Sequence, residues 1–377
     1  MSGNLGQRGV LDTKDQHLSD HNVLHSMHDA VVWMDAPSTT AQNDANLAAA
    51  IALAISSRVG RTVVIPSGAY TFSTNFSIVN ASGLRIVGCG HQTVINSTLN
   101  DTSKALFEFD DCRECVISNL YVNVTAALGG VVRFRNVTGS AVTPTYNMVE
   151  DVHIEGKNNL QYGIIVGGTN NIDANNDFNV FRRVYVAGYT ISGAYLRAIS
   201  QSYNNSFEDC LFYGGTGALC GMDAGGNYGG SFHWRRGFVN AHATADFNLG
   251  RSYQPYTIDG VNSEGSKRFI VIDSAAAYCQ AVVRNSRYAA NAIHVDLQAI
   301  MASSAGAQLT IDTCSIGDSS SDAAVQITGH ASSKIVMRQS RMYSSAGSVF
   351  NGVTPIELLG NVKITNEGAL TTVALTQ

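Results

Sequence analysis

The chain has 377 residues, of which only 14% are charged, and its formal net charge is −5 at pH 7. This balance provides no basic stripe for nucleic acid, and no apolar run reaches the roughly 18 residues that a membrane-spanning helix needs. Nucleic-acid binding and membrane insertion are therefore excluded from the expected functions. Gly accounts for 36 residues and Pro for only 5, a mixture typical of many short strands joined by tight turns.

The first thirty residues carry four histidines, namely His17, His21, His25 and His28. At i, i+4, i+8 and i+11 they would line one side of a helix. Such a stripe could hold a metal ion or an anion if three chains bring their stripes together, or it could belong to an arm that docks to another protein. We assign residues 1–30 to a docking arm and leave metal binding by its histidines open. No metal or cofactor is predicted for the rest of the chain.

Residues 31–104 are expected to form a cap and the first coils of the fold. Asn43 and Asp44 are possible N-caps of a helix from Asn46 to Ser57. After Gly60 the apolar period changes from that of a helix to that of strands separated by turns. The predicted apolar face of the helix consists of Leu47, Ala50, Ile51, Ala54 and Ile55.

From residue 105 to 377 the same pattern recurs: an apolar alternation, two corner residues, and a second alternation that ends in Gly or Asn. The residue after each corner pair recurs at intervals of 21 to 32 residues. A repeat of this length that tolerates insertions favours a β-solenoid over a closed propeller. These anchor positions are Leu120, Val152, Val184, Cys210, Gly237, Val261, Ser286, Cys314, Ser340 and Asn361.

Charged residues of alternating sign stand two positions before eight of these anchors. Successive coils lie ~4.8 Å apart, so opposite charges in register would pair and like charges would repel. A second column starts in the same way with Asp151, Arg183, Asp209 and Arg236. We predict a charge ladder that fixes the register of the coils. Its members are Glu150, Arg182, Glu208, Arg235, Asp259, Arg284, Asp312 and Arg338.

The seven cysteines are an odd number and stand mostly at strand positions, among them Cys89. Buried thiols in a reduced compartment are the expected state. Cys112 and Cys115 form one CxxC motif without a second pair, so zinc binding is not predicted.

The candidate catalytic residues come from aligning the strand about twelve residues past each anchor. This alignment places Arg197, Asp223, Gly250, Asp273 and Gln298 in one outward column. Asp223 and Asp273 would then be two rungs apart, roughly 9–10 Å. That separation is near the upper end of the ~6.5–9.5 Å of inverting glycosidases. Two surface aspartates without catalytic function remain the alternative.

Aromatic and cationic side chains around this column are the candidate substrate-binding residues. Aromatic rings stack on sugar rings, and Arg or His could hold acidic sugars or take an α-proton in an elimination. Trp234 is expected to face the core, and the loop acid Glu264 is a reserve catalytic candidate. The candidate substrate-binding residues are Arg197, Tyr228, His233, Arg251 and Tyr253.

The stretch from Val31 to Val124 resembles the N-terminal cap of the pectate-lyase-like superfamily, which includes polygalacturonases and many bacteriophage tailspikes. The likeness is carried by Asn43-Asp44, the alanine-rich helix, and the segments at 63–70 and 84–90. It implies an all-β, single-stranded right-handed parallel β-helix with an N-terminal capping helix. It also implies side-by-side association of three solenoids and contact with polysaccharide.

The catalytic motifs of that superfamily are not recognisable in this chain. Polygalacturonases carry N-x-D and D-D words followed by G-H, but Asp110-Asp111 lies early in a corner and Gly329-His330 has no aspartate partner. No equivalent of the calcium-binding acids or the catalytic arginine of pectate lyases is visible. Site residues therefore do not transfer from the resemblance.

Two classes of function follow. The first is a phage tailspike-like protein that binds a host surface polysaccharide and depolymerises it as a glycoside hydrolase or lyase. The second is a non-catalytic virion protein, a fibre or capsid decoration, that uses the solenoid as a spacer or glycan-binding surface. Met1–Asn4 does not begin a secretory signal, so we expect a virion location, or an extracellular one after host lysis. The expected partners are the glycan, other virion proteins through the arm, and two further copies in a homotrimer.

Overall fold

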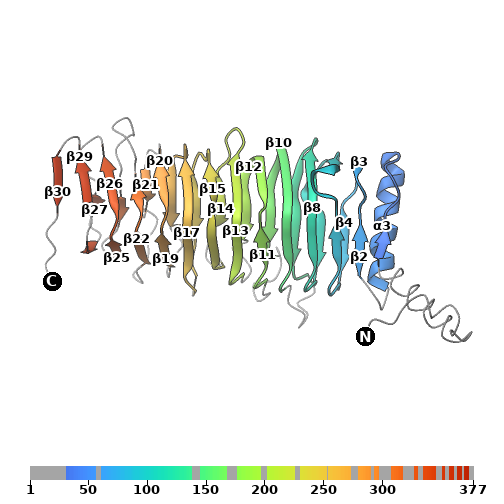
Figure 1. Ribbon diagram of the computed structural model, residues 1–377, viewed down its shortest axis with the longest axis horizontal. Coiled ribbons are helices and arrows are strands. Elements are labelled where there is room, and N and C mark those ends of the chain that lie inside the picture. The colour runs from blue at the N-terminus through green and yellow to red at the C-terminus, as the bar shows by residue number, and fades with distance from the viewer. Residues whose placement is uncertain are drawn as a thin grey trace, which may run out of the picture.

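The computed structural model shows an elongated parallel β-helix with one α-helix at its N-terminal end (Figure 1). The predicted parallel β-helix with a capping helix is confirmed. The predicted docking arm, residues 1–30, lies outside the described residues. The structure describes residues 31–56, 61–137, 145–167, 176–196, 202–225, 230–252, 254–272, 279–289, 293–296, 307–316, 327–329, 334–344, 350–352, 356–360, 363–366 and 369–372.

The capping helix α3 spans Thr40–Ser56 and begins earlier than the predicted Asn46. Asn43 is a buried residue of the first turn, not an N-cap, and its side chain accepts the Ser38 N–H at 2.9 Å. Asp44 instead accepts the backbone N–H of Ser73 at 3.1 Å and so ties the helix to the first coil. The predicted apolar face is confirmed, because Leu47, Ala50, Ile51 and Ala54 are all buried.

The first of three parallel sheets begins at the helix-capped end, and its strands pair from coil to coil. Its short strands are β1 (Val31–Trp33), β2 (Thr62–Val64), β5 (Arg85–Val87), β11 (Val180–Arg182), β19 (Cys279–Arg284), β22 (Ala307–Asp312), β25 (Lys334–Arg338) and β28 (Ile356–Leu359). It also contains the first parts of β8 (Val116–Val124), β10 (Met148–Val166), β13 (Asn205–Gly214), β15 (Phe232–Asn240) and β17 (Tyr256–Glu264).

The second sheet continues these long strands past a corner, and the third sheet closes each coil. The second adds β3 (Gly68–Phe72), β6 (Thr93–Ser97), the start of β12 (Tyr185–Leu196), β20 (Arg287–Ala289), β23 (Ser315–Ile316), β26 (Arg341–Ser344) and β29 (Lys363–Asn366), with β30 (Ala369–Thr372) antiparallel to β29. The third contains β4 (Phe76–Val79), β7 (Asp101–Asp110), β9 (Leu128–Arg135), the ends of β10 and β12, β14 (Cys220–Ala224), β16 (Ala245–Leu249), β18 (Arg268–Ile272), β21 (Ile293–Asp296), β24 (Ile327–Gly329) and β27 (Phe350–Gly352).

One residue in left-handed conformation turns the chain from the first sheet to the second in coil after coil. Its φ lies between 45° and 71°. Because each such residue directly precedes an anchor, the corner explains why the repeat was visible in the sequence. These residues are Asn119, Asp151, Arg183, Asp209, Arg236, Gly260, Asn285, Thr313, Gln339 and Gly360.

The register confirms the predicted anchors wherever they are described. Leu120 pairs with Val152, Cys210 with Gly237, and Gly237 with Val261. The neighbouring pairs on each side place the other anchors in the same column. Asn361 lies outside the described residues.

The strand register confirms the predicted order of the charge ladder, since the eight residues lie opposite one another with alternating sign. Arg182 contacts Glu150 at 3.3 Å and Glu208 at 3.1 Å. In the second column Arg183 contacts Asp151 at 2.6 Å. These side chains are partly solvated, so each pair contributes only ~0–1 kcal/mol and serves register more than stability.

Stacked side chains fill the interior. Rings of Phe134, Phe181, Phe207 and Trp234 follow one another with centroids 4.6 to 6.2 Å apart, which confirms Trp234 as a core residue. Beside them the buried amide of Asn179 accepts the side-chain N–H of Asn147 at 3.0 Å. These coils are therefore held to one another by apolar stacking and by amide hydrogen bonds.

All seven cysteines are free thiols, and six of them are buried. Cys89 is exposed, contrary to expectation, because it lies just before the short 3-10 helix η1 (Gly90–Gln92) and not within a strand. Cys112 and Cys115 are buried at the corner between β7 and β8. No helix in the described ranges combines the length and the apolar character required to cross a membrane.

A substitution at the anchor Gly237 should be strongly destabilising. Gly237 has φ of 121°, and an added Cβ would lie 2.1 Å from the carbonyl oxygen of Cys210. We expect Gly237→Ala to lower the free energy of unfolding by about 2–4 kcal/mol. Gly217→Ala is the matched control, because Gly217 has φ of 78° but no heavy atom within 4 Å of the added Cβ. Equal losses in denaturant titrations of the two variants would contradict the role of the close contact.

Candidate functional site

Three of the predicted site residues that the structure describes lie on different sheets. Asp223 lies on the outer side of the third sheet, Glu264 on the second and His233 on the first. Arg251 lies in the connection that follows β16. The remaining candidates, Arg197, Tyr228, Tyr253 and Asp273, lie outside the described residues.

The predicted column around Asp223 is wrong in its register. Asp223 pairs with Tyr195 on one side and with Asn248 on the other, and not with Gly250 of the predicted column. The carboxylate accepts the Asn248 side-chain N–H at 2.9 Å. The error arises because the turn between Asn240 and Ala245 is two residues shorter than the corresponding turn of the preceding coil. A fixed count of residues from each anchor therefore places Asp223 two positions out of register with the residues of the neighbouring coils.

His233 and Glu264 are each held by their own local surroundings. Burial, and then the nearby charge of Arg235, lower the pKa of His233. Glu264 accepts the Asn262 side-chain N–H at 3.3 Å and lies 3.5 Å from Arg287. Neither residue is next to Asp223, so these three positions do not form one catalytic centre.

A continuous row of aromatic rings covers the outer side of the second sheet, and sequence reasoning missed it. Consecutive ring centroids lie 4.1 to 5.8 Å apart. Neighbouring rings are tilted against one another by 31 to 44°, and each ring is at least partly exposed, so that ring surface, hydroxyl groups and imidazole nitrogens are accessible from outside. We call this surface the aromatic face. Its rings are His91, Tyr121, His153, Tyr185, Tyr213 and Phe238.

A carboxylate lies in the middle of the aromatic face. Glu155 Oε1 is 2.8 Å from His153 Nε2, and both side chains are partly exposed. Burial, and then the charge of Glu155, raise the pKa of Tyr121 and of Tyr185. The site therefore combines one acid, one imidazole and two phenols within neighbouring rungs, a set that can exchange hydrogen bonds and protons with a polar ligand.

Glu155 belongs to a second, mostly polar row beside the rings. Its residues pair from coil to coil over seven rungs, a length of about 29 Å at the strand spacing. Asn123 donates its side-chain N–H to Asn96 at 3.2 Å within this row. The anchors contained the signal for both rows, because most rings stand one residue past an anchor and the polar residues stand three past it. The row consists of Asn96, Asn123, Glu155, Ala187, Tyr213, Asn240 and Glu264.

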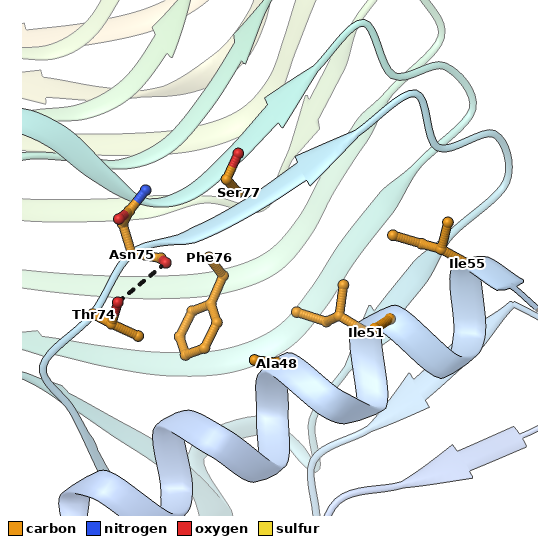
Figure 2. Close-up of a pocket in the computed structure, with 8 residues that line it drawn as sticks. Ala48, Ile51, Ile55, Thr74, Asn75, Phe76 and Ser77 are labelled. Atoms are coloured by element: carbon orange, nitrogen blue, oxygen red, sulfur yellow. Dashed lines mark hydrogen bonds between the residues drawn. The ribbon is translucent and has the colours of Figure 1, made fainter.

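A groove of about 350 Å³ lies between α3 and β4. Figure 2 shows Ala48, Ile51 and Ile55 along the side of the helix that faces Phe76 on the strand. Its polar rim is engaged in the fold, because Asn75 donates its side-chain N–H to Glu108 at 3.2 Å. The groove thus has apolar walls but few free polar groups to orient a ligand. Within the described ranges no three His, Cys, Asp or Glu residues are grouped so that they could hold a metal ion.

Comparison with known proteins gives matches in structure only. No protein-family model matches the sequence, and no curated protein matches it. The A-module of the mannuronan C-5 epimerase AlgE4 from Azotobacter vinelandii matches with a TM-score of 0.59 and 12% identity, over 91% of this chain and 97% of that chain. The catalytic unit of a GH87 α-1,3-glucanase from Streptomyces thermodiastaticus matches with a TM-score of 0.53 and 13% identity, over 87% and 67%.

The Dettilon tailspike protein matches with a TM-score of 0.47 and 12% identity, over 95% of this chain and 74% of that chain. At such identities the first two likenesses concern the fold alone. They agree with the resemblance to the pectate-lyase-like β-helices that the capping segment suggested.

Proposed function

We propose that this protein binds a polysaccharide along the aromatic face. The observation that carries the proposal is the pair of rows on the second sheet, one of rings and one of polar side chains. Rings bury the apolar C–H surface of sugars while amide, hydroxyl and carboxylate groups exchange hydrogen bonds with sugar hydroxyls. Two proteins of the same fold bear the names of a mannuronan epimerase and a glucanase, which supports a polysaccharide as the ligand class.

Loss of one central ring should weaken this binding. Tyr185 lies 4.1 Å from His153 and 5.8 Å from Tyr213, measured between ring centroids. We expect Tyr185→Ala to raise the Kd for a bound glycan by about tenfold, equal to roughly 1.4 kcal/mol. The measurement is calorimetry or affinity electrophoresis against a panel of bacterial capsular and O-antigen polysaccharides.

The control for this experiment is Tyr146→Ala, which removes an exposed ring outside the second sheet and should leave the affinity unchanged. Thermal melting of both variants establishes that they are folded. Equal affinity of wild type and Tyr185→Ala for every bound glycan would remove the aromatic face from the proposal.

Depolymerisation of the glycan is the second part of the proposal, with Asp223, Asp273 and Glu264 as the candidate acids. Asp223→Asn should abolish chain shortening without lowering the melting temperature. Shortened chains without new absorbance near the unsaturated uronate band would indicate hydrolysis, and shortened chains with it would indicate elimination. Unchanged cleavage would exclude Asp223.

The setting that we propose is a phage particle, with the protein as a tailspike-like homotrimer attached to other virion proteins through residues 1–30. Absence of cleavage across the whole panel, with binding retained, would favour the non-catalytic role of a fibre or decoration protein. The aromatic face serves both versions equally, because binding does not depend on catalysis.

A further inference from the structure

We infer that Glu155 is a specificity-determining residue that selects glycans that are uncharged where they cross the middle of the aromatic face. This inference rests on the proposed function and names its substrate class. A polyanionic chain, such as a polyuronate, would place carboxylates beside a carboxylate of the protein. Like charges brought together at an interface cost affinity and suppress the wrong partner.

The carboxylate of Glu155 lies on the outer side of the second sheet, where the glycan would bind. Its side chain is 28% exposed, and its carboxylate lies 2.8 Å from the imidazole of His153. Its neighbours in the polar row are Asn123 and Ala187, neither of which carries a charge. Within the polar row the carboxylate therefore stands between uncharged side chains, and the His153 imidazole is its contact on the side of the rings.

The effect of this charge extends over the neighbouring rungs. Glu155 contributes to the raised pKa of both Tyr121 and Tyr185, which lie on opposite sides of His153. A negative charge on a bound sugar next to either phenol would be opposed in the same way as the phenolate is. The repulsion would thus act on a glycan over at least three rungs.

The Lys and Arg residues of these two rows are distant from Glu155 along the described strands. Among the described residues that stand one or three positions past an anchor, no Lys or Arg occurs before Arg287. Arg287 lies five rungs beyond His153, about 24 Å at the strand spacing, and it already lies 3.5 Å from Glu264. At physiological ionic strength that distance exceeds the Debye length of ~8 Å.

Lys157 is the nearest lysine in sequence to Glu155. Its backbone and that of Asn158 have φ of 51° and 64°, so the chain turns out of the two rows at this point. Lys157 is exposed and is therefore a suitable control position.

The test compares each polysaccharide of a panel in two matched forms, as a polyuronate and as the same polymer with its carboxyl groups reduced to hydroxymethyl groups. We expect wild type to bind the reduced form of at least one polymer, with a Kd about tenfold lower than that for the polyuronate. Glu155→Gln, which has the same shape without the charge, should bring the two Kd values within about threefold by improving polyuronate binding. Lys157→Ala should leave their ratio unchanged.

Three results would overturn the inference. Polyuronates bound as tightly as the reduced forms, or an unchanged ratio in Glu155→Gln, would overturn it while leaving the aromatic face as a glycan-binding surface. Binding of no polymer in either form would overturn the proposed function and the inference together. Because the first two results require binding and the third excludes it, the two failures are distinguishable.

Discussion

Glu108→Leu should lower the free energy of unfolding by about 3–5 kcal/mol, one of the two largest losses expected for this protein. Glu108 is 1% exposed on the outer side of β7. Its carboxylate accepts hydrogen bonds from Arg133 at 3.0 Å, from the backbone N–H of Ala105 at 3.1 Å and from Asn75 at 3.2 Å. Leucine fills a similar volume but leaves these donors without this acceptor, and Arg133 is itself only 8% exposed.

The control is the same change in the charge ladder. Glu150→Leu removes a carboxylate that contacts Arg182 and Arg183 but whose side chain is 25% exposed, so its loss should be ~0–1 kcal/mol. Chemical denaturation and thermal melting of both variants give the comparison. The double variant Glu108→Leu with Arg133→Met should recover part of the loss, because an apolar pair replaces an unpaired buried charge. Equal losses for Glu108→Leu and Glu150→Leu would contradict the importance of burial.

The second large loss is expected for Asp246→Ala, which removes the centre of a polar network inside the solenoid. Asp246 Oδ1 lies 2.6 Å from His242 Nδ1 and accepts the Ser266 hydroxyl at 2.5 Å, and Oδ2 accepts the hydroxyl of Ser263. His242 Nε2 lies 2.6 Å from the Tyr189 hydroxyl oxygen. All of these side chains are buried, so their groups would lose a partner that water does not replace. We expect a loss of about 3–5 kcal/mol in denaturant titrations.

Asp209→Ala is the matched control, because Asp209 contacts Arg236 at 2.6 Å but has a side chain that is 38% exposed. Its loss should stay within ~0–1 kcal/mol. A loss for Asp209→Ala as large as that for Asp246→Ala would show that the interior network is not specially stabilising.

Asp246 should also make the folding stability of the protein depend on pH. Burial raises the pKa of Asp246 above the value of an unfolded chain. The folded state therefore binds the proton more tightly, and the stability contributed by this group is fully present below the unfolded pKa of about 4. It is lost as the pH rises through the folded pKa. The difference in melting temperature between wild type and Asp246→Asn should accordingly change in favour of the variant as the pH increases, and the opposite trend would refute the assignment.

The sequence predicted the features that repeat at a fixed position in each coil. Leu120, Val152 and the other described anchors are in register because one corner residue always precedes them. The alternating signs of Glu150, Arg182 and Glu208 could be paired for the same reason. Both patterns lie on the segment whose length is constant.

The predicted column around Asp223 was wrong because it lies beyond the segment of constant length. Asp223 was placed in the wrong column because the turns between the second and third sheets differ in length, and turn length is not visible from strand periodicity. The aromatic face could have been predicted from the sequence, since Tyr121 and His153 directly follow their anchors. It was not predicted because one outward ring in a single coil looks like an isolated surface residue until the rings of successive coils are aligned.

The left-handed corner between the first and second sheets has a further consequence for engineering. Turns at the other junctions differ in length between described coils, as in the turn from Gly214 to Cys220, which has two more residues than its successor. A foreign peptide spliced into such a turn would leave both rows of the neighbouring sheet at their native spacing. The solenoid is thus a scaffold on which loops could be exchanged to display new sequences, whereas even one residue added at the corner would shift every outward side chain of that strand by one position.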